Sequence, residues 1–128
     1  MSFDMSNPER MLPQTPLGLR MVEWLGALNT GNVYLMSGFA QARFAKAALA
    51  RKSADERALE DFRLYQERGE LELRSVERSS DNEMVVFAQS SRTKEWNSIR
   101  LQVERAEPHG VTLIEVQRIP APPETAAQ

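Results

Sequence analysis

Apolar and polar residues alternate in the carboxyl-terminal half of the chain, which is typical of β-strands with one buried face. The clearest case is residues 96–104, where polar side chains separate Ile99, Leu101 and Val103. A Pro-His-Gly turn follows, and such residues favour chain reversal. Residues 111–119 then carry apolar side chains at both parities. We therefore expect an antiparallel pair of strands, the second of which is at least partly covered on both faces.

Two shorter apolar runs precede this pair and extend the predicted sheet. Leu71 and Leu73 alternate with charged residues and predict a first strand. Residues 84–88 are continuously apolar, which is typical of a strand that is covered on both faces. Turn-forming residues separate the runs at 79–82 and at 91–94. Together the runs predict a four-stranded antiparallel meander.

The amino-terminal half predicts three helices, from apolar residues at helical spacing and from capping residues. Thr15 precedes a proline and caps the first helix, and Asn32 caps the second. Ser53 and Glu56 form a capping box for the third helix, which Gly69 ends. The fold class that this order indicates is α+β, with three amino-terminal helices packed on a four-stranded antiparallel sheet.

The second helix contains a feature that suggests packing, and the third contains one that suggests an exposed face. Residues 40–50 are rich in alanine, and they continue the second helix either after a bend or as one long helix. Gly38 weakens that helix by about 1 kcal/mol relative to alanine, so we expect a close packing neighbour. On the third helix, Arg57 and Asp61 are four residues apart and predict an ion pair on a solvent-exposed face.

Length and proline content divide the chain into one domain with two polar ends. The chain has 128 residues, which fits a single domain. Residues 1–14 are polar and carry two prolines, so they predict a flexible amino-terminal arm. Residues 120–128 form a proline-rich carboxyl-terminal tail. The domain itself spans residues 15–119.

Charge and composition exclude several classes of function. The chain has 16 basic and 18 acidic residues, well mixed, with a net charge of −2, so nucleic acid is not an expected partner. It has no cysteine and one histidine, His109, and no motif for a metal or cofactor. There is no long apolar run or secretory signal. We therefore expect no membrane association and a cytoplasmic location, although an exported form whose signal had been removed would look the same.

A short stretch at the end of the first helix is similar to a known signature. Trp24 and Leu25, followed by Ala-Leu-Asn-Thr-Gly-Asn at 27–32, resemble the WL-x-AFNSGD signature of small domains that precede bacterial serine hydrolase or tail-specific-protease-like domains. Those domains belong to the nuclear transport factor 2-like superfamily, also described as SnoaL-like or cystatin-like. Residues 15–123 resemble its order of helices followed by antiparallel strands. The resemblance implies a cone-shaped domain, in which a curved sheet wraps a long helix and often holds a pocket.

The resemblance shapes the expected function without supplying a reaction. No Gly-x-Ser-x-Gly motif occurs in the chain, so we expect no hydrolase chemistry of that kind from these residues. We expect a non-catalytic binding or accessory domain, which acts through protein contacts or by binding a small apolar ligand. The alternative is a small isomerase, cyclase or hydratase-type enzyme that uses a pocket carboxylate or tyrosine.

Glu115 is the candidate for such a carboxylate. It shares its parity with Val111 and Leu113 in the last predicted strand. If that parity faces the core, burial would raise the pKa of Glu115 and make it a possible general base. If the sheet bulges, or if Ile114 and Val116 face inward instead, Glu115 is a solvated residue of the outer face.

Aromatic residues provide the candidate lining of a pocket, although they are equally suited to filling the core. The candidates are Trp24, Phe39, Phe62, Tyr65, Phe87 and Trp96. Strands that are apolar on both faces would also leave one apolar face in water, and such faces usually meet a partner. We therefore predict a homodimer through the outer face of the sheet, or docking of that face on a hydrolase domain.

Overall fold

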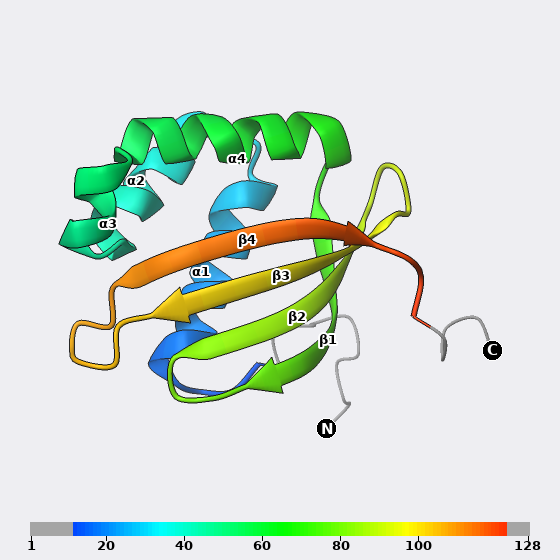
Figure 1. The fold of residues 1–128 in the computed structure, drawn as a ribbon. Helices are drawn as coiled ribbons and strands as arrows, with labels where there is room; N and C mark the ends of the chain where they lie inside the picture. The colour runs from blue at the N-terminus through cyan, green and yellow to red at the C-terminus, as the bar shows by residue number, and fades with distance from the viewer. Residues whose placement is uncertain (1–11, 123–128) are drawn as a thin grey trace, which may run out of the picture.

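The computed structural model describes residues 12–122 and has an α+β fold. A layer of helices lies on one face of an antiparallel sheet, and the other face is open to solvent (Figure 1). The predicted arm and tail lie mostly outside the described residues. Within the described part of the arm, Leu12 is buried against the core, so the packed domain begins slightly before the predicted boundary at residue 15.

The four strands follow one another in space in the order of the chain. They form a meander of order β1-β2-β3-β4 in which every neighbouring pair is antiparallel, which confirms the prediction. Their bounds are β1 Leu71–Ser79, β2 Glu83–Ser90, β3 Trp96–Val103 and β4 Val111–Ile119.

Alternate residues of the two central strands form the floor of the core. Met84 and Val86 of β2 pair with Leu101 and Ile99 of β3, and none of the four is accessible to solvent. Burying a side chain of this size contributes about 1.5–3 kcal/mol. The residues between them point to the outer face, so the period of two in the sequence places one face of the sheet in the core.

A β-bulge near the start of β4 determines which of its residues face inward. Val103 pairs with Val111, but the preceding Gln102 pairs with Leu113, so one residue of β4 is skipped. Both Val111 and Ile114 therefore reach the inner face, although they differ in parity. Downstream of the bulge, Val116 continues the inner set because it pairs with Ile99.

Four helices make up the other layer, where the sequence predicted three. They are α1 Pro16–Asn29, α2 Val33–Arg43, α3 Lys46–Arg51 and α4 Ala54–Arg68. The predicted caps are confirmed: the side chains of Thr15 and Asn32 accept backbone N–H groups, and Ser53 with Glu56 forms a complete capping box.

The alanine-rich stretch divides into two helices because its middle contacts the sheet. Phe44 and Ala45 have extended backbone conformations. Phe44 forms an isolated bridge with Val111, and the backbone N–H of Ala45 donates to the carbonyl of Val111. This approach is close: a Cβ atom on Gly110 would lie 2.8 Å from the Cα atom of Ala45.

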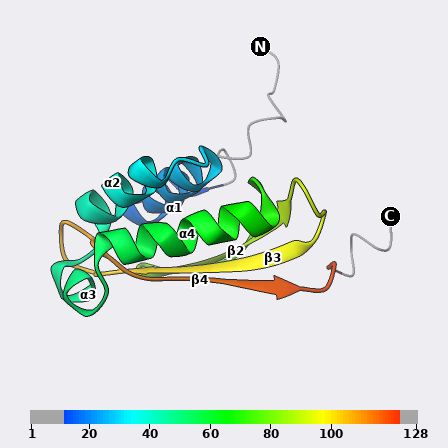
Figure 2. The ribbon, with the colours of Figure 1, turned by 90° about the horizontal axis from the view of Figure 1, so that it is seen from above.

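The helices lie together on the inner face of the sheet (Figure 2). Helix α1 crosses β2 and β3, while α4 packs mainly against α2. Met21, Trp24 and Leu28 of α1 are inaccessible or nearly so and fill the space above the central strands. Gly38 of α2 differs from expectation, because a Cβ atom there would meet nothing within 4 Å.

Candidate functional site

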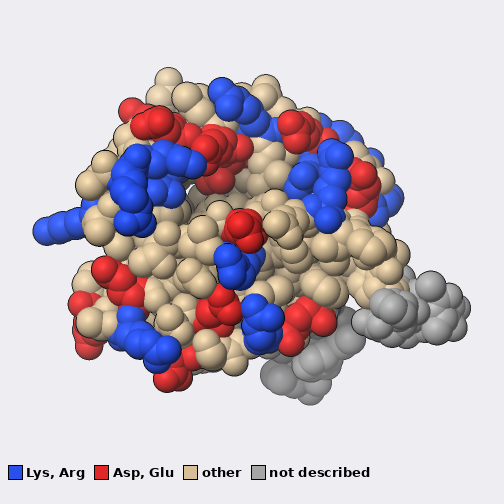
Figure 3. Space-filling model, viewed as in Figure 1, with Lys and Arg blue, Asp and Glu red and all other residues tan. Residues whose placement is uncertain are grey.

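A cleft opens where α4 passes over β4, and we call it the α4–β4 cleft. Ile114 and Val116 lie on the inner face of β4 and contact the core, yet they remain partly exposed. Helix α4 packs on α2 and does not cover them fully. Figure 3 shows the resulting hollow between the helical layer and the upper edge of the sheet. The floor of the cleft is therefore apolar.

One face of α4 forms the roof of this cleft. Arg57, Asp61, Leu64 and Arg68 recur at intervals of three and four residues, so they share one side of the helix. Ala58, Phe62 and Tyr65 lie on the adjacent side, where α4 packs on the other helices. The roof thus contains three ionisable side chains above an apolar floor.

Asp61 is the most perturbed acid of the described residues. Its Oδ2 atom accepts a hydrogen bond from the indole Nε1 of Trp24, with 3.2 Å between the two atoms. Burial raises the pKa of Asp61 to about 7, and the neighbouring Glu60 adds to this rise. The Trp24 hydrogen bond and the charge of Arg57 act in the opposite direction but do not compensate for the lost hydration.

The second oxygen of Asp61 is accessible to solvent. Among residues 12–122, no group donates a hydrogen bond to Oδ1. This oxygen is not buried. An unpaired oxygen that is not buried is in contact with solvent. Near neutral pH, Oδ1 accepts a hydrogen bond when the carboxyl group of Asp61 is ionised. When the group is protonated, it can donate one.

Arg57 closes the end of the cleft nearest to α3. Its guanidinium donates to the carbonyl oxygens of Ala48 and Lys52, at 2.7 and 3.0 Å, and lies 4.3 Å from the ring centroid of Phe44. These contacts tie α4 to the end of α3. Arg57 therefore has a packing role, in place of the solvent-exposed ion pair with Asp61 that the sequence predicted.

The opposite end of the cleft is polar and basic. Arg68 donates from Nη1 to Oδ1 of Asn97, with 2.7 Å between the atoms. Asn97 is fully buried on the inner face of β3, and Arg118 of β4 pairs with it across the sheet. The side chain of Ser90 contacts the carbonyl oxygen of Arg68. The carboxyl-terminal end of α4 is thus fixed to the sheet beside two arginines.

Glu115 lies outside this site. It pairs with Arg100 across the outer face of the sheet, at 3.6 Å between Oε1 and Nε, and its side chain is 44% exposed. The bulge and the inward direction of Ile114 and Val116 produce this placement. Of the two alternatives that the sequence left open for Glu115, the structure has the solvated outer-face one.

The predicted aromatic lining is distributed over three places. Trp24 reaches the cleft through its bond to Asp61. Phe39, Phe62 and Tyr65 are packed within the helical layer, where Phe39 contacts Phe44 edge to face with centroids 6.1 Å apart. Phe87 and Trp96 point to the outer face, since Phe87 pairs with Ser98 and Trp96 with Gln89. The six residues therefore do not line one pocket.

Sequence reasoning missed Asp61 and Arg68 as site residues. A signal for Asp61 exists, because it lies at the edge of the stripe formed by Ala58, Phe62 and Tyr65 on the packed side of α4. An acid at the edge of such a stripe is placed against the core. For Arg68 there is no comparable local signal, since Asn97 is 29 residues away in the chain.

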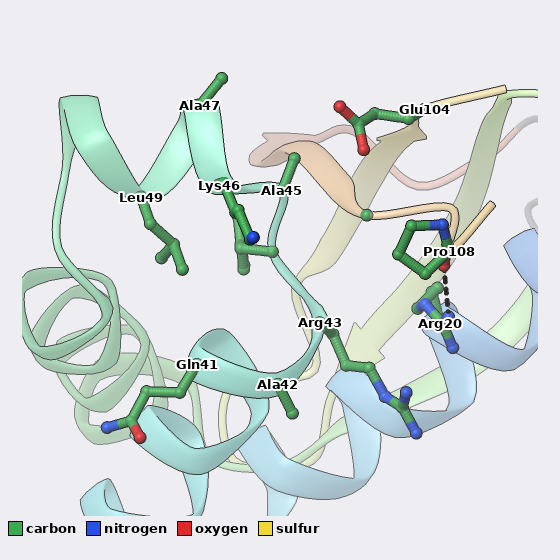
Figure 4. A pocket seen from close by; sticks show the side chains of 12 residues that line it. Arg20, Gln41, Ala42, Arg43, Ala45, Lys46, Ala47, Leu49, Glu104 and Pro108 are labelled. Carbon is green, nitrogen blue, oxygen red and sulfur yellow. Dashed lines mark hydrogen bonds between the residues drawn. The ribbon is translucent and has the colours of Figure 1, made fainter. Parts of the chain in front are cut away.

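A second hollow, of about 380 Å³, lies between the α2–α3 junction and the turn before β4 (Figure 4). Arg20 and Arg43 line it. Arg20 donates to the carbonyl of Pro108 at 3.0 Å, and both arginines bind the carboxylate of Glu23. These bonds fix the turn before β4 to α1 and α2, so we interpret this hollow as structural.

The described residues contain neither a candidate membrane span nor a candidate metal site. No helix within residues 12–122 has the length and apolar character needed to cross a membrane. In the same part of the chain, no group of three or more acidic or histidine side chains is placed to hold a metal ion.

Comparison of the chain with protein-family models, with curated proteins and with solved structures finds no match. The proposed function therefore rests on the geometry of the α4–β4 cleft.

Proposed function

We propose that this protein is a binding domain for a small, mainly apolar molecule, which lies in the α4–β4 cleft with a polar group at Asp61. The single observation that carries this proposal is the placement of Asp61. One oxygen of its carboxyl group is held by Trp24, and the other is unpaired and accessible to solvent on the face of α4 that forms the roof of the cleft. A half-buried acid that is held on one side only is arranged to meet a partner on the other.

The floor of the cleft supports an apolar ligand. Ile114 and Val116 face inward but keep part of their surface in water. Covering apolar surface contributes about 2.5 kcal/mol for each 100 Å² removed from water. A small ligand that spans both side chains would therefore gain affinity from contact alone, while Asp61 would orient it.

The filled core beneath the cleft favours binding over catalysis. Trp24, Met21 and Leu28 occupy the space above the central strands, so a ligand would lie in an open cleft. Enzymes of acid–base chemistry commonly exclude water from the reacting groups. The resemblance to nuclear transport factor 2-like domains supports a ligand between helices and sheet, and it equally supports an accessory role beside a hydrolase domain.

A second candidate function is a small isomerase, cyclase or hydratase, with Asp61 in place of the carboxylate that the sequence suggested. The observation that favours it is the pKa of Asp61, which is raised to about 7 by burial. An acid that titrates near the working pH is suited to general acid–base catalysis. Tyr65 does not supply the acid, because its ring packs against Gly31 away from the cleft.

Nuclear magnetic resonance tests the binding proposal directly. The indole N–H of Trp24 and the methyl groups of Ile114 and Val116 report on the roof and the floor of the cleft. We expect apolar fragments that carry one hydrogen-bonding group to shift these signals together. Asp61→Asn should weaken such fragments by about tenfold, the loss of one hydrogen bond to an ionisable group.

A matched variant and a turnover assay complete the test. Asp81→Asn makes the same chemical change at a residue in the β1–β2 turn whose side chain is 92% exposed, and it should leave binding unchanged. A fragment collection that leaves all three reporter signals unmoved at millimolar concentration would refute the binding site. Chemical conversion of a bound fragment, abolished by Asp61→Asn, would favour the enzyme instead.

A further inference from the structure

The guanidinium of Arg68 is incompletely paired at the mouth of the α4–β4 cleft. Its Nη1 donates to Asn97, but its Nε is buried and has no hydrogen-bond partner. Buried donors are almost always paired in folded proteins. Nη2 of the same guanidinium also has no partner among the described residues, and it is not buried. It is therefore the donor that an acceptor from outside the chain can reach.

Arg118 adds a second positive charge at the same place. It lies opposite Asn97 in the register of β3 and β4, and Asn97 is the residue that Arg68 contacts. The pKa of Arg68 is lowered first by burial and next by the positive charge of Arg118. Two neighbouring arginines therefore repel each other, and an anion between them would relieve that repulsion.

Carboxylates of the chain compensate these charges only in part. Glu95 approaches Arg118, with 3.6 Å between Oε1 and Nε, but both side chains are about half exposed, so the pair is weak. Glu67 and Glu95 both favour the charged form of Arg68. Among the described residues, however, no carboxylate oxygen lies within ion-pair distance of the Arg68 guanidinium.

Arg100 shows what a compensated arginine looks like in this protein. Its Nε is also buried without a hydrogen bond. Two carboxylates nevertheless accompany its guanidinium, Glu83 at 3.5 Å and Glu115 at 3.6 Å. Arg68 lacks such partners, and it differs from Arg100 in lying on the inner side of the sheet, at the end of the cleft.

We propose that the ligand of the α4–β4 cleft is an organic acid, whose carboxylate is bound by Arg68 and Arg118 and whose apolar body extends over Val116 and Ile114 toward Asp61. This inference rests on the proposed binding function and names the class of ligand. The planar fork of a guanidinium matches a carboxylate. Because Glu95 already engages Arg118, the site favours a singly charged group over a phosphate dianion.

The spacing of the roof residues sets the size of this ligand. Asp61 and Arg68 are seven residues apart on one face of α4, which corresponds to roughly 10 Å along a helix that rises 1.5 Å per residue. A medium-chain acid can therefore place its carboxylate at the arginines and the far end of its chain beside Asp61. Octanoate probes the arginines and the apolar floor alone, because the end of its chain has no polar group for Asp61, and 1-octanol and octylammonium share its apolar chain.

The experiment is a titration of the full-length protein with these three probes at constant ionic strength. Binding is followed by the Trp24 indole signal and by the methyl signals of Ile114 and Val116. We expect octanoate to bind at least about tenfold more tightly than 1-octanol, and octylammonium to bind most weakly. Arg118→Gln, at a side chain that is 56% exposed, should reduce the preference for octanoate over 1-octanol.

Two further variants separate charge from folding. Arg68→Gln should lose the preference for the acid, whereas Arg68→Lys should keep part of it because the charge remains. Arg74→Gln removes an arginine that contacts Glu72 and Gln89, far from the cleft, and should behave like the unchanged protein.

The outcomes distinguish this inference from the proposed function. Equal binding of octanoate and 1-octanol, or an unchanged preference in Arg118→Gln, would overturn the organic-acid ligand while the binding cleft stands. If none of the three probes moves the reporter signals, both the cleft and its ligand class are wrong.

Discussion

The indole of Trp24 donates its Nε1 hydrogen to Oδ2 of Asp61, at 3.2 Å, and thereby joins α1 to α4. Trp24 is almost fully buried in the core, so this bond anchors a titratable carboxyl group to a rigid support. The bond also gives the cleft a built-in reporter, because changes at Asp61 alter the environment of the indole. The Trp24–Asp61 pair therefore links the stability of the fold to the protonation state of Asp61 in the proposed binding site.

The stability of the protein should fall as pH rises toward and through 7. The pKa of Asp61 is raised from the ordinary 3.8 to about 7 in the folded state, so between these values the folded state holds a proton that the unfolded state has lost. Ionisation then costs up to about 4 kcal/mol by pH 8. Urea unfolding from pH 4 to 8 should show this loss in the natural protein and its absence in Asp61→Asn.

The difference between the two proteins isolates this contribution from those of other groups. Asp61→Asn should match the natural protein near pH 4 and exceed its stability at pH 8. Asp81→Asn, at an exposed turn residue, should follow the natural protein throughout. Parallel pH profiles for the natural protein and Asp61→Asn would show that Asp61 titrates normally.

Replacing Trp24 by phenylalanine should raise the pKa of Asp61 further. The hydrogen bond from Trp24 favours the charged carboxylate and so lowers this pKa; without it, the effect of burial is less opposed. The substitution also leaves a small void and costs about 1–3 kcal/mol of stability. The carboxyl ¹³C signal of Asp61, followed against pH, measures the shift, and a lowered pKa would contradict the role assigned to the bond.

Two glycines should respond in opposite ways to alanine. At Gly38, in α2, a Cβ atom meets nothing within 4 Å, so Gly38→Ala should stabilise the protein by up to about 1 kcal/mol. At Gly110, a Cβ atom would lie 2.8 Å from the Cα atom of Ala45, so Gly110→Ala should destabilise it by about 1–3 kcal/mol. Thermal unfolding of both variants checks the prediction, and a stabilised Gly110→Ala would show that the junction of α2 and α3 is loose.

Dimerisation through the outer face of the sheet stays a prediction. Phe87 lies on this face, where Figure 3 shows charged side chains interleaved with other residues. If the dimer forms, Phe87→Glu should prevent it at little cost in stability, because the side chain is only partly buried. Leu59→Glu, on the exposed side of α4, is the matched control. Sedimentation velocity at high micromolar concentration measures the association, and dimers that persist in Phe87→Glu would require another interface.

Much of the secondary structure is predictable from residues close together in the chain. The period of two around Ile99 identifies a strand, and Thr15, Asn32 and Ser53 cap the helices in the predicted places. Such signals are local, because a side chain that accepts a backbone N–H three residues away needs no other part of the fold. The sequence left a bend within residues 40–50 as one of two alternatives, but the division at Phe44 depends on a contact with Val111 and could not be placed from the sequence.

The candidate site was much less predictable than the fold. Parity alone made Glu115 the candidate acid, but a single bulge between β3 and β4 leaves it on the outer face. Asp61 resembled an ordinary residue of a charged helix face, and its burial became visible only with Trp24 beside it.

The sequence by itself determined the strands, the helix starts and the α+β class, because periodicity and capping act over a few residues. Only the tertiary structure decided which carboxyl group faces the cleft and which arginines stand at its mouth. Those placements depend on strand register and on how α4 packs, and both are set by contacts between residues that lie tens of positions apart in the chain, such as Trp24 with Asp61 and Arg68 with Asn97.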